Sequence, residues 1–347
     1  MVIWNAIWPF LIALLLLFSL VVVHELGHFL MGKALKFKIE EFAVGFGPKL
    51  LSRKGKDGVL YSFRALPIGG FCRFHDNEEG KPEPGAFASE KPWKRLLVLL
   101  AGPAMNVLLA FLLAVVLLGA FGVPVVKIGS IVPDSPAQLA GLETGDLLMK
   151  IDGEDALSYR MLDQLKDANA DGVSLTVLHD GSEKDIFVAD IYNAEEGRNM
   201  LGINMVDSGQ KHRLSAGNLL FYSGEYMWRM STQMVKGILS LFAQPAKIVT
   251  QASGPVGTIN IIQEGIRQGV STALEWAMIF SLNLGIFNLM PFPALDGGRI
   301  LLTLIEMVRR KPLSRNLEGM INLAGFACLM LIMVMATFGD ISRLIGG

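Results

Sequence analysis

The chain has 347 residues, of which 52% are hydrophobic and 18% are charged, and its formal net charge is -1. With a positive mean hydropathy, this composition is typical of a membrane protein with some water-soluble mass and argues against a globular enzyme. The near-neutral charge gives no sign of nucleic-acid binding. Cys72 and Cys328 lie far apart without zinc-ligand spacing, which argues against a disulfide framework.

The first apolar segment, residues 7–31, contains an HExxH motif at residues 24–28. The segment leads into this motif and not into a small-residue cleavage site, so we expect it to remain as a membrane span. Two histidines four residues apart lie on one face of a helix, so His24 and His28 can share one metal ion, and Glu25 can act on a water that the metal binds. Ionisable groups within an apolar helix are costly and by default mark function, which disfavours a purely structural role.

Three further apolar segments are long enough to cross a bilayer, which takes about 20 residues per helix. They cover residues 96–121, about 274–292 and about 320–338. The segment 32–95 and the loop between the third and fourth spans are rich in Lys and Arg, which predicts that both lie in the cytoplasm. Both chain termini and the region 122–272 then lie on the extracytoplasmic side.

Residues 122–207 are polar, with short predicted strands separated by Gly and Asp. Residues 131–153 predict a strand, a short helix, a turn and a strand, with Ser135 as the helix N-cap and Pro136 at the first helical position. The pattern resembles a PDZ domain of the bacterial, circularly permuted kind. Such domains bind extended peptides, and residues 201–203 are a candidate ligand loop; the alternative is a spacer or size filter over the site.

The connection to the third span contains a predicted amphipathic helix at about 258–270. This helix could lie along the outer membrane surface, or it could be a plain connector. The expected organisation has four parts. They are residues 1–121 with the first two spans and a membrane-associated β segment at about 37–75, residues 122–207 as the PDZ domain, residues 208–272 as a linker, and residues 273–347 with the last two spans.

A catalytic zinc needs three protein ligands and an open position for water, and HExxH supplies two of them. Asp296 is the third candidate, because an uncharged span ends in two prolines that are followed by this carboxylate and two glycines. The prolines break the helix so that the backbone can aim the carboxylate sideways, while Gly297 and Gly298 allow close backbone approach. The first and third spans run in the same direction, so Asp296 and HExxH reach the same depth. The alternative is an ordinary aspartate at the end of a span.

HExxH in the first span, combined with Asn-x-x-Pro-x-Pro-x-Leu-Asp-Gly at residues 288–297, resembles the site-2 protease family of intramembrane zinc metalloproteases. The PDZ domain after the second span narrows this to the bacterial regulator of sigma-E protease type. Four further motifs agree, at residues 41–48, 66–71, 91–95 and 101–106. The best-known members carry two tandem PDZ domains, whereas this chain has room for one.

The expected fold is therefore a polytopic α-helical membrane protein with four transmembrane helices, a β-hairpin segment and an inserted α+β PDZ domain. Residues 37–75 alternate as strands at about 39–47 and 61–74. The resemblance implies that this hairpin re-enters the membrane beside the site, where its edge can pair with an unwound substrate. The alternative is a cytoplasmic hairpin that only caps the membrane face.

The resemblance also implies one zinc per chain, held by His24, His28 and Asp296, with Glu25 as the general base. The resemblance implies that Asn288 contacts the substrate backbone or stabilises the oxyanion. The alternative is that Asn288 makes an interhelical hydrogen bond. The candidate substrate-binding residues are Asn288, Gly69, Gly70, Phe71, Gly45 and Gly47.

The expected activity is cleavage of transmembrane segments of single-pass membrane proteins in the bacterial inner membrane, with anti-sigma factors or remnant signal peptides as substrates implied by the resemblance. The other expected partners are the lipid bilayer and a peptide or C-terminus at the PDZ domain, with no nucleic acid. Two other functions stay open. A catalytically silent membrane PDZ scaffold would not need all four site residues intact, and a metal transporter would need neither Glu25 nor a PDZ domain.

Overall fold

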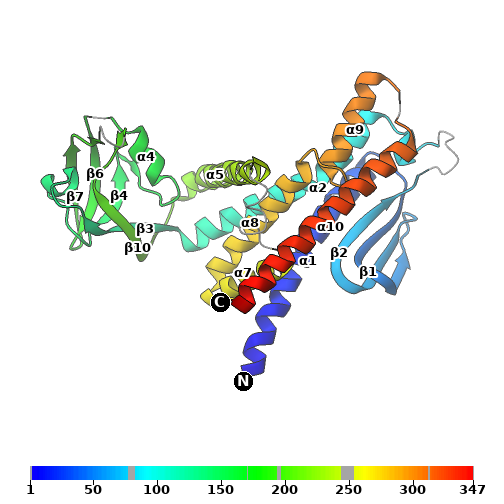
Figure 1. Ribbon diagram of the computed structural model, residues 1–347, viewed down its shortest axis with the longest axis horizontal. Coiled ribbons are helices and arrows are strands. Elements are labelled where there is room, and N and C mark those ends of the chain that lie inside the picture. Colours follow the sequence, from blue (N-terminus) through cyan, green and yellow to red (C-terminus); the bar gives the residue numbers. More distant parts are fainter. Residues whose placement is uncertain are drawn as a thin grey trace. The chain divides into compact units, whose positions relative to one another are not determined.

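The computed structural model describes residues 2–76, 83–169, 171–193, 197–243, 254–311 and 313–346. Within these ranges four helices are long and apolar enough to cross a membrane, which confirms the predicted number of spans. They are α1 (Val2–Ala34), α2 (Pro92–Phe121), α8 (Val270–Leu289) and α10 (Arg315–Gly346) (Figure 1). The chain divides into two compact units, Met1–Ala114 with Met227–Gly347, and Val115–Tyr226.

The third span ends at Leu289, earlier than the predicted residue 292. Met290 is extended, with φ -64° and ψ 140°, because the residue before a proline is disfavoured in the helical region. Pro291 in turn has no N–H with which to continue the helix. The chain turns here and resumes as α9 (Asp296–Arg309).

In the first unit, β1 (Ile39–Lys54) and β2 (Leu60–Phe74) form a two-stranded antiparallel sheet that packs against α1 (Figure 1). These are the strands predicted within residues 37–75, but β1 continues beyond residue 47. Phe29 of α1 shares a small buried core with Ile39 and Val59 of the hairpin. This core fixes the sheet on the helix that carries HExxH. A short 3-10 helix, Phe87–Ser89, precedes α2.

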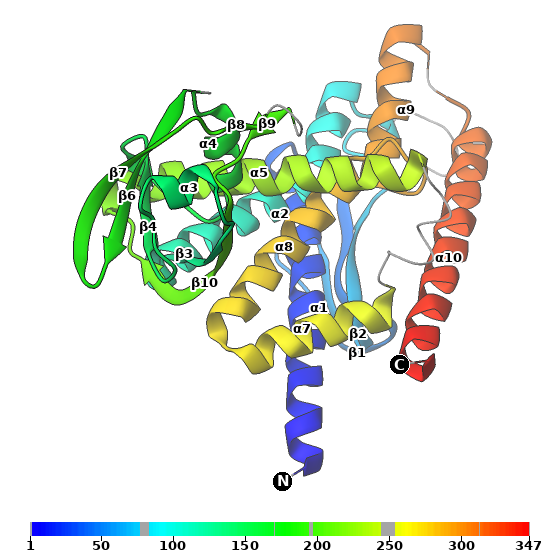
Figure 2. The ribbon, with the colours of Figure 1, turned by 60° about the vertical axis from the view of Figure 1, so that its left-hand side comes forward.

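Helix α7 (Pro255–Gln268) corresponds to the amphipathic helix predicted at 258–270. It packs against α1, α8 and α10 (Figure 2), and Ile262 on its apolar face is fully buried. Protein therefore covers at least part of the apolar face, and whether the helix lies along the membrane surface or is a plain connector stays a prediction. Helix α5 (Ala216–Ala243) occupies the first part of the predicted linker, and residues 244–253 of that linker lie outside the described residues.

One carboxylate joins α10 to α7. Asp340 is 3% exposed and accepts hydrogen bonds from the backbone N–H groups of Gly254 at 3.1 Å and Gly257 at 2.7 Å. These N–H groups belong to the first turn of α7, where no intrahelical acceptor exists and where the helix dipole favours negative charge. Asp340 is therefore a helix cap that a neighbouring helix supplies.

Asp340→Ala is expected to destabilise the first unit by about 2 kcal/mol, because two N–H groups lose a charged acceptor. Asp340→Asn keeps one acceptor oxygen and should fall between Asp340→Ala and the wild type. Thermal unfolding of the purified protein in detergent measures this order, with Ser342→Ala as the control on the same turn. Equal melting temperatures for wild type and Asp340→Ala would show that the cap contributes nothing.

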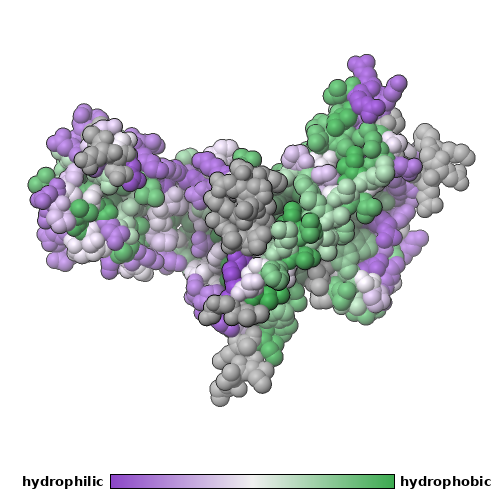
Figure 3. All heavy atoms as spheres, viewed as in Figure 1, coloured by the Kyte–Doolittle hydropathy of each residue, from purple (hydrophilic) through white to green (hydrophobic). Residues whose placement is uncertain are grey.

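The surface of the first unit suits contact with lipid tails. Hydrophobic side chains cover α10 and the visible part of α1, whereas hydrophilic side chains cover most of the second unit's visible face (Figure 3). On α10, Leu323, Leu331 and Phe338 are each more than half exposed. Exposing apolar surface to water costs about 25 cal/mol per Å², so these helices are suited to hydrocarbon.

The second unit contains a six-stranded antiparallel sheet and two short helices. The strands are β3 (Val123–Ile131), β4 (Leu147–Ile151), β5 (Glu154–Asp155), β6 (Gly172–His179), β7 (Ser182–Ala189) and β10 (Ile203–His212). Their order is β10-β3-β4-β6-β7, with β5 paired to β4. The helices are α3 (Pro136–Leu139) and α4 (Met161–Asp167), and β8 (Tyr192–Asn193) pairs separately with β9 (Arg198–Asn199).

The local predictions for this unit agree with its structure. The Ser135 side chain accepts a hydrogen bond from the backbone N–H of Gln138, and Pro136 is the first residue of α3. Ile128 and Leu175 lie in one buried core with residues of both helices. Strand β10 runs to His212, past residue 207, because it pairs with β3 along its length and forms one edge of the sheet.

Candidate metal centre

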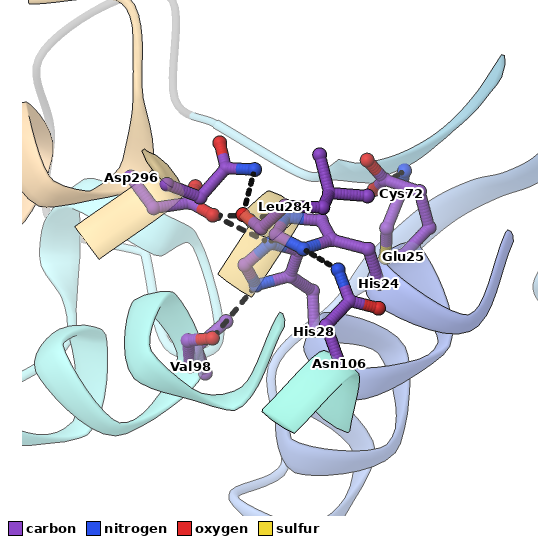
Figure 4. A network of polar contacts seen from close by, with 9 residues as sticks. His24, Glu25, His28, Cys72, Val98, Asn106, Leu284 and Asp296 are labelled. Atoms are coloured by element: carbon purple, nitrogen blue, oxygen red, sulfur yellow. Dashed lines mark hydrogen bonds and ion pairs between the residues drawn. The ribbon is translucent and has the colours of Figure 1, made fainter. Parts of the chain in front are cut away.

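The two histidines of HExxH lie one helical turn apart on α1, and their rings face Asp296 (Figure 4). The Nε2 atoms of His24 and His28 are 3.2 Å apart, and Oδ2 of Asp296 lies 3.0 Å and 3.2 Å from them, respectively. Both histidines are buried. Three candidate ligand atoms, from segments far apart in the chain, therefore converge on one point.

Asp296 reaches this point because the chain turns sharply between α8 and α9. Ala294 adopts a left-handed conformation with φ 74°, and its N–H donates to Oδ1 of Asn322 in α10 at 3.2 Å. Asp296 then opens α9. Gly297 and Gly298 pack so closely on the preceding loop that an added Cβ would overlap its backbone, so this turn requires glycine.

Helix α2 approaches the histidines through a second glycine. A Cβ added to Gly102 would lie 2.9 Å from Nε2 of His24 and closer still to Nε2 of His28. On the facing helix, a Cβ on Gly27 would overlap the carbonyl of Ala101. The two glycines together let the backbones of α1 and α2 touch beside the metal ligands.

Helix α2 also supplies partners for the ring nitrogens that face away from Asp296. Nδ1 of His28 lies 2.8 Å from the backbone carbonyl oxygen of Val98, to which it donates. The side-chain amide of Asn106 lies 3.2 Å from Nδ1 of His24. Both contacts are buried, and they leave both Nε2 atoms for the shared point.

This donor set fits a zinc ion. Two ligand atoms that are each about 2.05 Å from a tetrahedral zinc lie about 3.3 Å apart, close to the observed 3.0 to 3.2 Å. Nδ1 of His28 donates to the Val98 carbonyl, so a neutral His28 ring would present a lone pair on Nε2 to the Asp296 carboxylate. A cation between the two groups would make this contact favourable, and two imidazoles with one carboxylate are a typical zinc ligand set.

Glu25 lies beside these ligands, in the wall of a cavity of about 480 Å³ that His24, His28 and Asp296 also line. The backbone N–H of Cys72 in β2 donates to its Oε2 at 3.0 Å. This hydrogen bond holds one carboxylate oxygen and leaves the other for proton transfer. Strand β2 therefore positions the candidate base.

The Cys72 side chain also lines this cavity. Burial, helped by the Glu25 carboxylate, raises the pKa of the Cys72 thiol to about 12. At physiological pH the thiol is neutral, and a neutral thiol is a poor nucleophile and metal ligand.

Two of the predicted substrate-binding residues, Phe71 and Asn288, line the cavity that contains Glu25. Gly70 lies next to the Glu25 side chain. The Asn288 amide donates to the Leu284 carbonyl of its own helix at 2.9 Å, so this hydrogen bond is not interhelical.

The remaining predicted glycines lie elsewhere on the hairpin. Gly69 lines a second, apolar cavity of about 610 Å³ together with residues of α1, α7 and α10. Gly45 and Gly47 are part of neither cavity wall in the described structure, and both pack near Leu66. Their positive φ angles, 92° and 83°, coincide with irregular pairing of β1 and β2.

The sequence assigned no role to Val98, Gly102 or Asn106, all of which contact the histidines. One signal was present, since an asparagine within an uncharged span is costly unless it has a polar partner. The Val98 carbonyl and the Cys72 N–H are backbone groups, and the sequence contains no signal for them.

The geometry of the site agrees with the protein family that the sequence matches. The family model described as Peptidase family M50 matches residues 12–332. The chain belongs to peptidase family M50. This membership confirms the resemblance predicted from HExxH and the Asp296 motif, and it makes the chain a metalloprotease.

Two relatives match this chain over nearly their whole length. A candidate zinc metalloprotease of Clostridium perfringens is 35% identical over 332 residues, which cover 95% of this chain and 97% of that protein. Zinc metalloprotease RasP of Oceanobacillus iheyensis is 28% identical over 422 residues, covering 96% of this chain and 99% of that protein. Among solved structures, the PDZ domain of the SdrC-like protein of Listeria innocua is 25% identical and covers 26% of this chain and 99% of its own, with a TM-score of 0.22.

Proposed function

We propose that this M50 metalloprotease is an intramembrane zinc protease that cleaves transmembrane segments of single-pass membrane proteins. The observation that carries the proposal is the convergence of His24, His28 and Asp296 beside Glu25, on helices long and apolar enough to span a bilayer. Ionisable groups at such a position are energetically costly, and by default they mark a functional site. We further propose one zinc per chain, bound by these three side chains.

The residues of the chain divide the chemistry between them. When bound, zinc would polarise the scissile carbonyl and lower the pKa of an attacking water. Glu25 accepts the proton of that water and returns it to the leaving amide nitrogen. The Cys72 N–H keeps the Glu25 carboxylate directed into the cavity during both transfers.

Two features support a helical membrane segment as the substrate. The apolar cavity of about 610 Å³ is lined by side chains of α1, α7 and α10 and is suited to an apolar helix. Its wall includes Gly69 of β2, and Phe71, two residues further, lines the cavity that contains Glu25. A substrate helix that unwinds there exposes backbone groups, and the edge of β2 offers partners for them.

The proposed placement follows the distribution of Lys and Arg in the sequence. The protein would span the bacterial inner membrane with both termini and the PDZ domain on the extracytoplasmic side, and with the site near the cytoplasmic face. The PDZ domain would take an extended peptide or C-terminus at the edge strand β10, or would exclude large substrates. The substrates would be remnants such as trimmed anti-sigma factors or signal peptides.

The test is cleavage of a model single-span substrate by purified protein in detergent, with zinc counted in each sample. Glu25→Gln is expected to lower the rate by about 100-fold or more and to keep zinc, because the base is lost and the ligands remain. Glu183→Gln, at an exposed position of β7, is the matched control and should cleave normally.

Three outcomes would count against parts of this proposal. Equal cleavage by wild type and Glu25→Gln would contradict the assigned base. Zinc without cleavage in the wild type, with substrates of several sequences, would favour the silent PDZ scaffold. Absence of zinc from the wild type would overturn the ligand assignment.

A further inference from the structure

The side chain of Asn106 in α2 faces Nδ1 of His24, the ring nitrogen that points away from Asp296. It is fully buried, and its amide nitrogen lies 3.2 Å from Nδ1 of His24 (Figure 4). Within the described residues its Oδ1 has no hydrogen-bond partner. The contact with His24 is therefore the one hydrogen bond of this side chain in the described part of the chain.

The proton position on His24 decides what this contact means. A neutral imidazole that offers Nε2 to a metal carries its proton on Nδ1, so Nδ1 must be a donor. An amide nitrogen is also a donor and cannot accept that proton. The oxygen and nitrogen of an asparagine amide occupy nearly equivalent positions and are assigned from the hydrogen-bond network, so a half-turn of the amide brings Oδ1 to Nδ1.

We propose that Asn106 is a positioning residue that accepts the Nδ1–H of His24 through Oδ1 and so directs Nε2 of His24 to the metal. This inference rests on the proposed function, since it concerns the same zinc site. His28 provides the internal comparison, because its Nδ1 donates to the Val98 carbonyl of the same helix at 2.8 Å. In both histidines of HExxH, Nδ1–H then donates to an oxygen acceptor from α2.

The arrangement matters because ligand histidines need a fixed ring orientation and tautomer. Hydrogen-bond partners behind the ligands typically contribute about 10- to 100-fold in metal affinity. A side chain that served only to join α2 to α8 would not change zinc affinity in this way. The link between α2 and α8 at this level uses the backbone carbonyl of Asn106, which accepts from the Ser281 hydroxyl at 2.8 Å, and a change of the Asn106 side chain leaves that bond in place.

The experiment measures zinc affinity of the full-length protein in detergent, with free zinc set by chelator buffers. Asn106→Leu keeps the bulk of the side chain but removes the acceptor, and it is expected to weaken zinc binding by about 10- to 100-fold. Asn106→Asp restores an oxygen acceptor and should bind zinc within a few-fold of the wild type. Ser281→Ala, which removes the neighbouring hydrogen bond to the Asn106 backbone, is the matched control and should leave zinc affinity unchanged.

Each outcome bears on the inference. Wild-type affinity in Asn106→Leu, or an Asn106→Asp variant as weak as Asn106→Leu, would overturn it while leaving the zinc protease intact. A wild type without zinc would instead overturn the proposed function. If Asn106→Leu is not monodisperse, Asn106→Ala takes its place against Asn106→Asp, and the same two results decide.

Discussion

Gly102→Ala is expected to lower zinc affinity by about 100-fold or more and to abolish proteolysis. The added Cβ would enter the space between the two histidines, 2.9 Å from Nε2 of His24 and closer still to Nε2 of His28. Either α2 withdraws from α1 or the rings rotate away. A displacement of about 1 Å at a reacting centre costs about 100-fold, and the ligands here would move at least that far.

Zinc per chain, counted by mass spectrometry, and cleavage of a single-span substrate measure this effect. Gly319→Ala is the control, because Gly319 also lies in a spanning helix and its added Cβ would meet no described atom within 4 Å. The control should keep full zinc and activity. Full zinc and activity in Gly102→Ala would mean that α1 and α2 do not pack as tightly as the structure has them.

The expected effect at Gly102 illustrates which parts of the site the sequence could predict. HExxH places two imidazoles on one helix face through local geometry alone. The prolines and glycines around Asp296 predicted a broken helix and a close turn, and the structure has both. The four spans followed from the length of uncharged runs, because a bilayer sets a minimum helix length.

The partners of these residues could not be predicted, because they depend on how helices pack. Val98 and Asn106 contact His28 and His24 only once α2 lies against α1 at one particular rotation. The same holds for the Cys72 N–H, whose direction toward Glu25 depends on how the hairpin docks on α1. Apolar spans have little periodicity to indicate such rotations, since lipid and protein interior are similarly apolar.

The amphipathic helix shows the same limit. A stripe of isoleucines with polar residues elsewhere suits both a membrane surface and a protein groove. In the structure α7 is packed on three helices and capped by Asp340. The sequence contained both the stripe and the aspartate, but their separation of more than 70 residues concealed the contact.

A buried ion pair joins α2 to the helix that begins with Asp296. Arg95 donates to Oε2 of Glu306 in α9 at 2.7 Å, and both side chains are less than 10% exposed. Oε1 of Glu306 accepts the backbone N–H of Leu313 at 2.8 Å, and the Arg95 guanidinium lies over the Phe87 ring. Since α9 carries Asp296 at its start, this pair holds the third candidate ligand relative to α2.

Arg95→Met is expected to destabilise the first unit by about 3 to 5 kcal/mol, because it leaves the Glu306 carboxylate buried without its partner charge. Glu306→Gln should cost a similar amount, because it leaves the Arg95 guanidinium buried without its partner charge. The double variant Arg95→Met/Glu306→Gln removes both charges and keeps an acceptor for Leu313, so it should be more stable than either single variant. Thermal unfolding in detergent, together with zinc counts, measures this order. A double variant whose loss equals the sum of the two single losses would show that the charges are not coupled, and that α9 is held by other contacts.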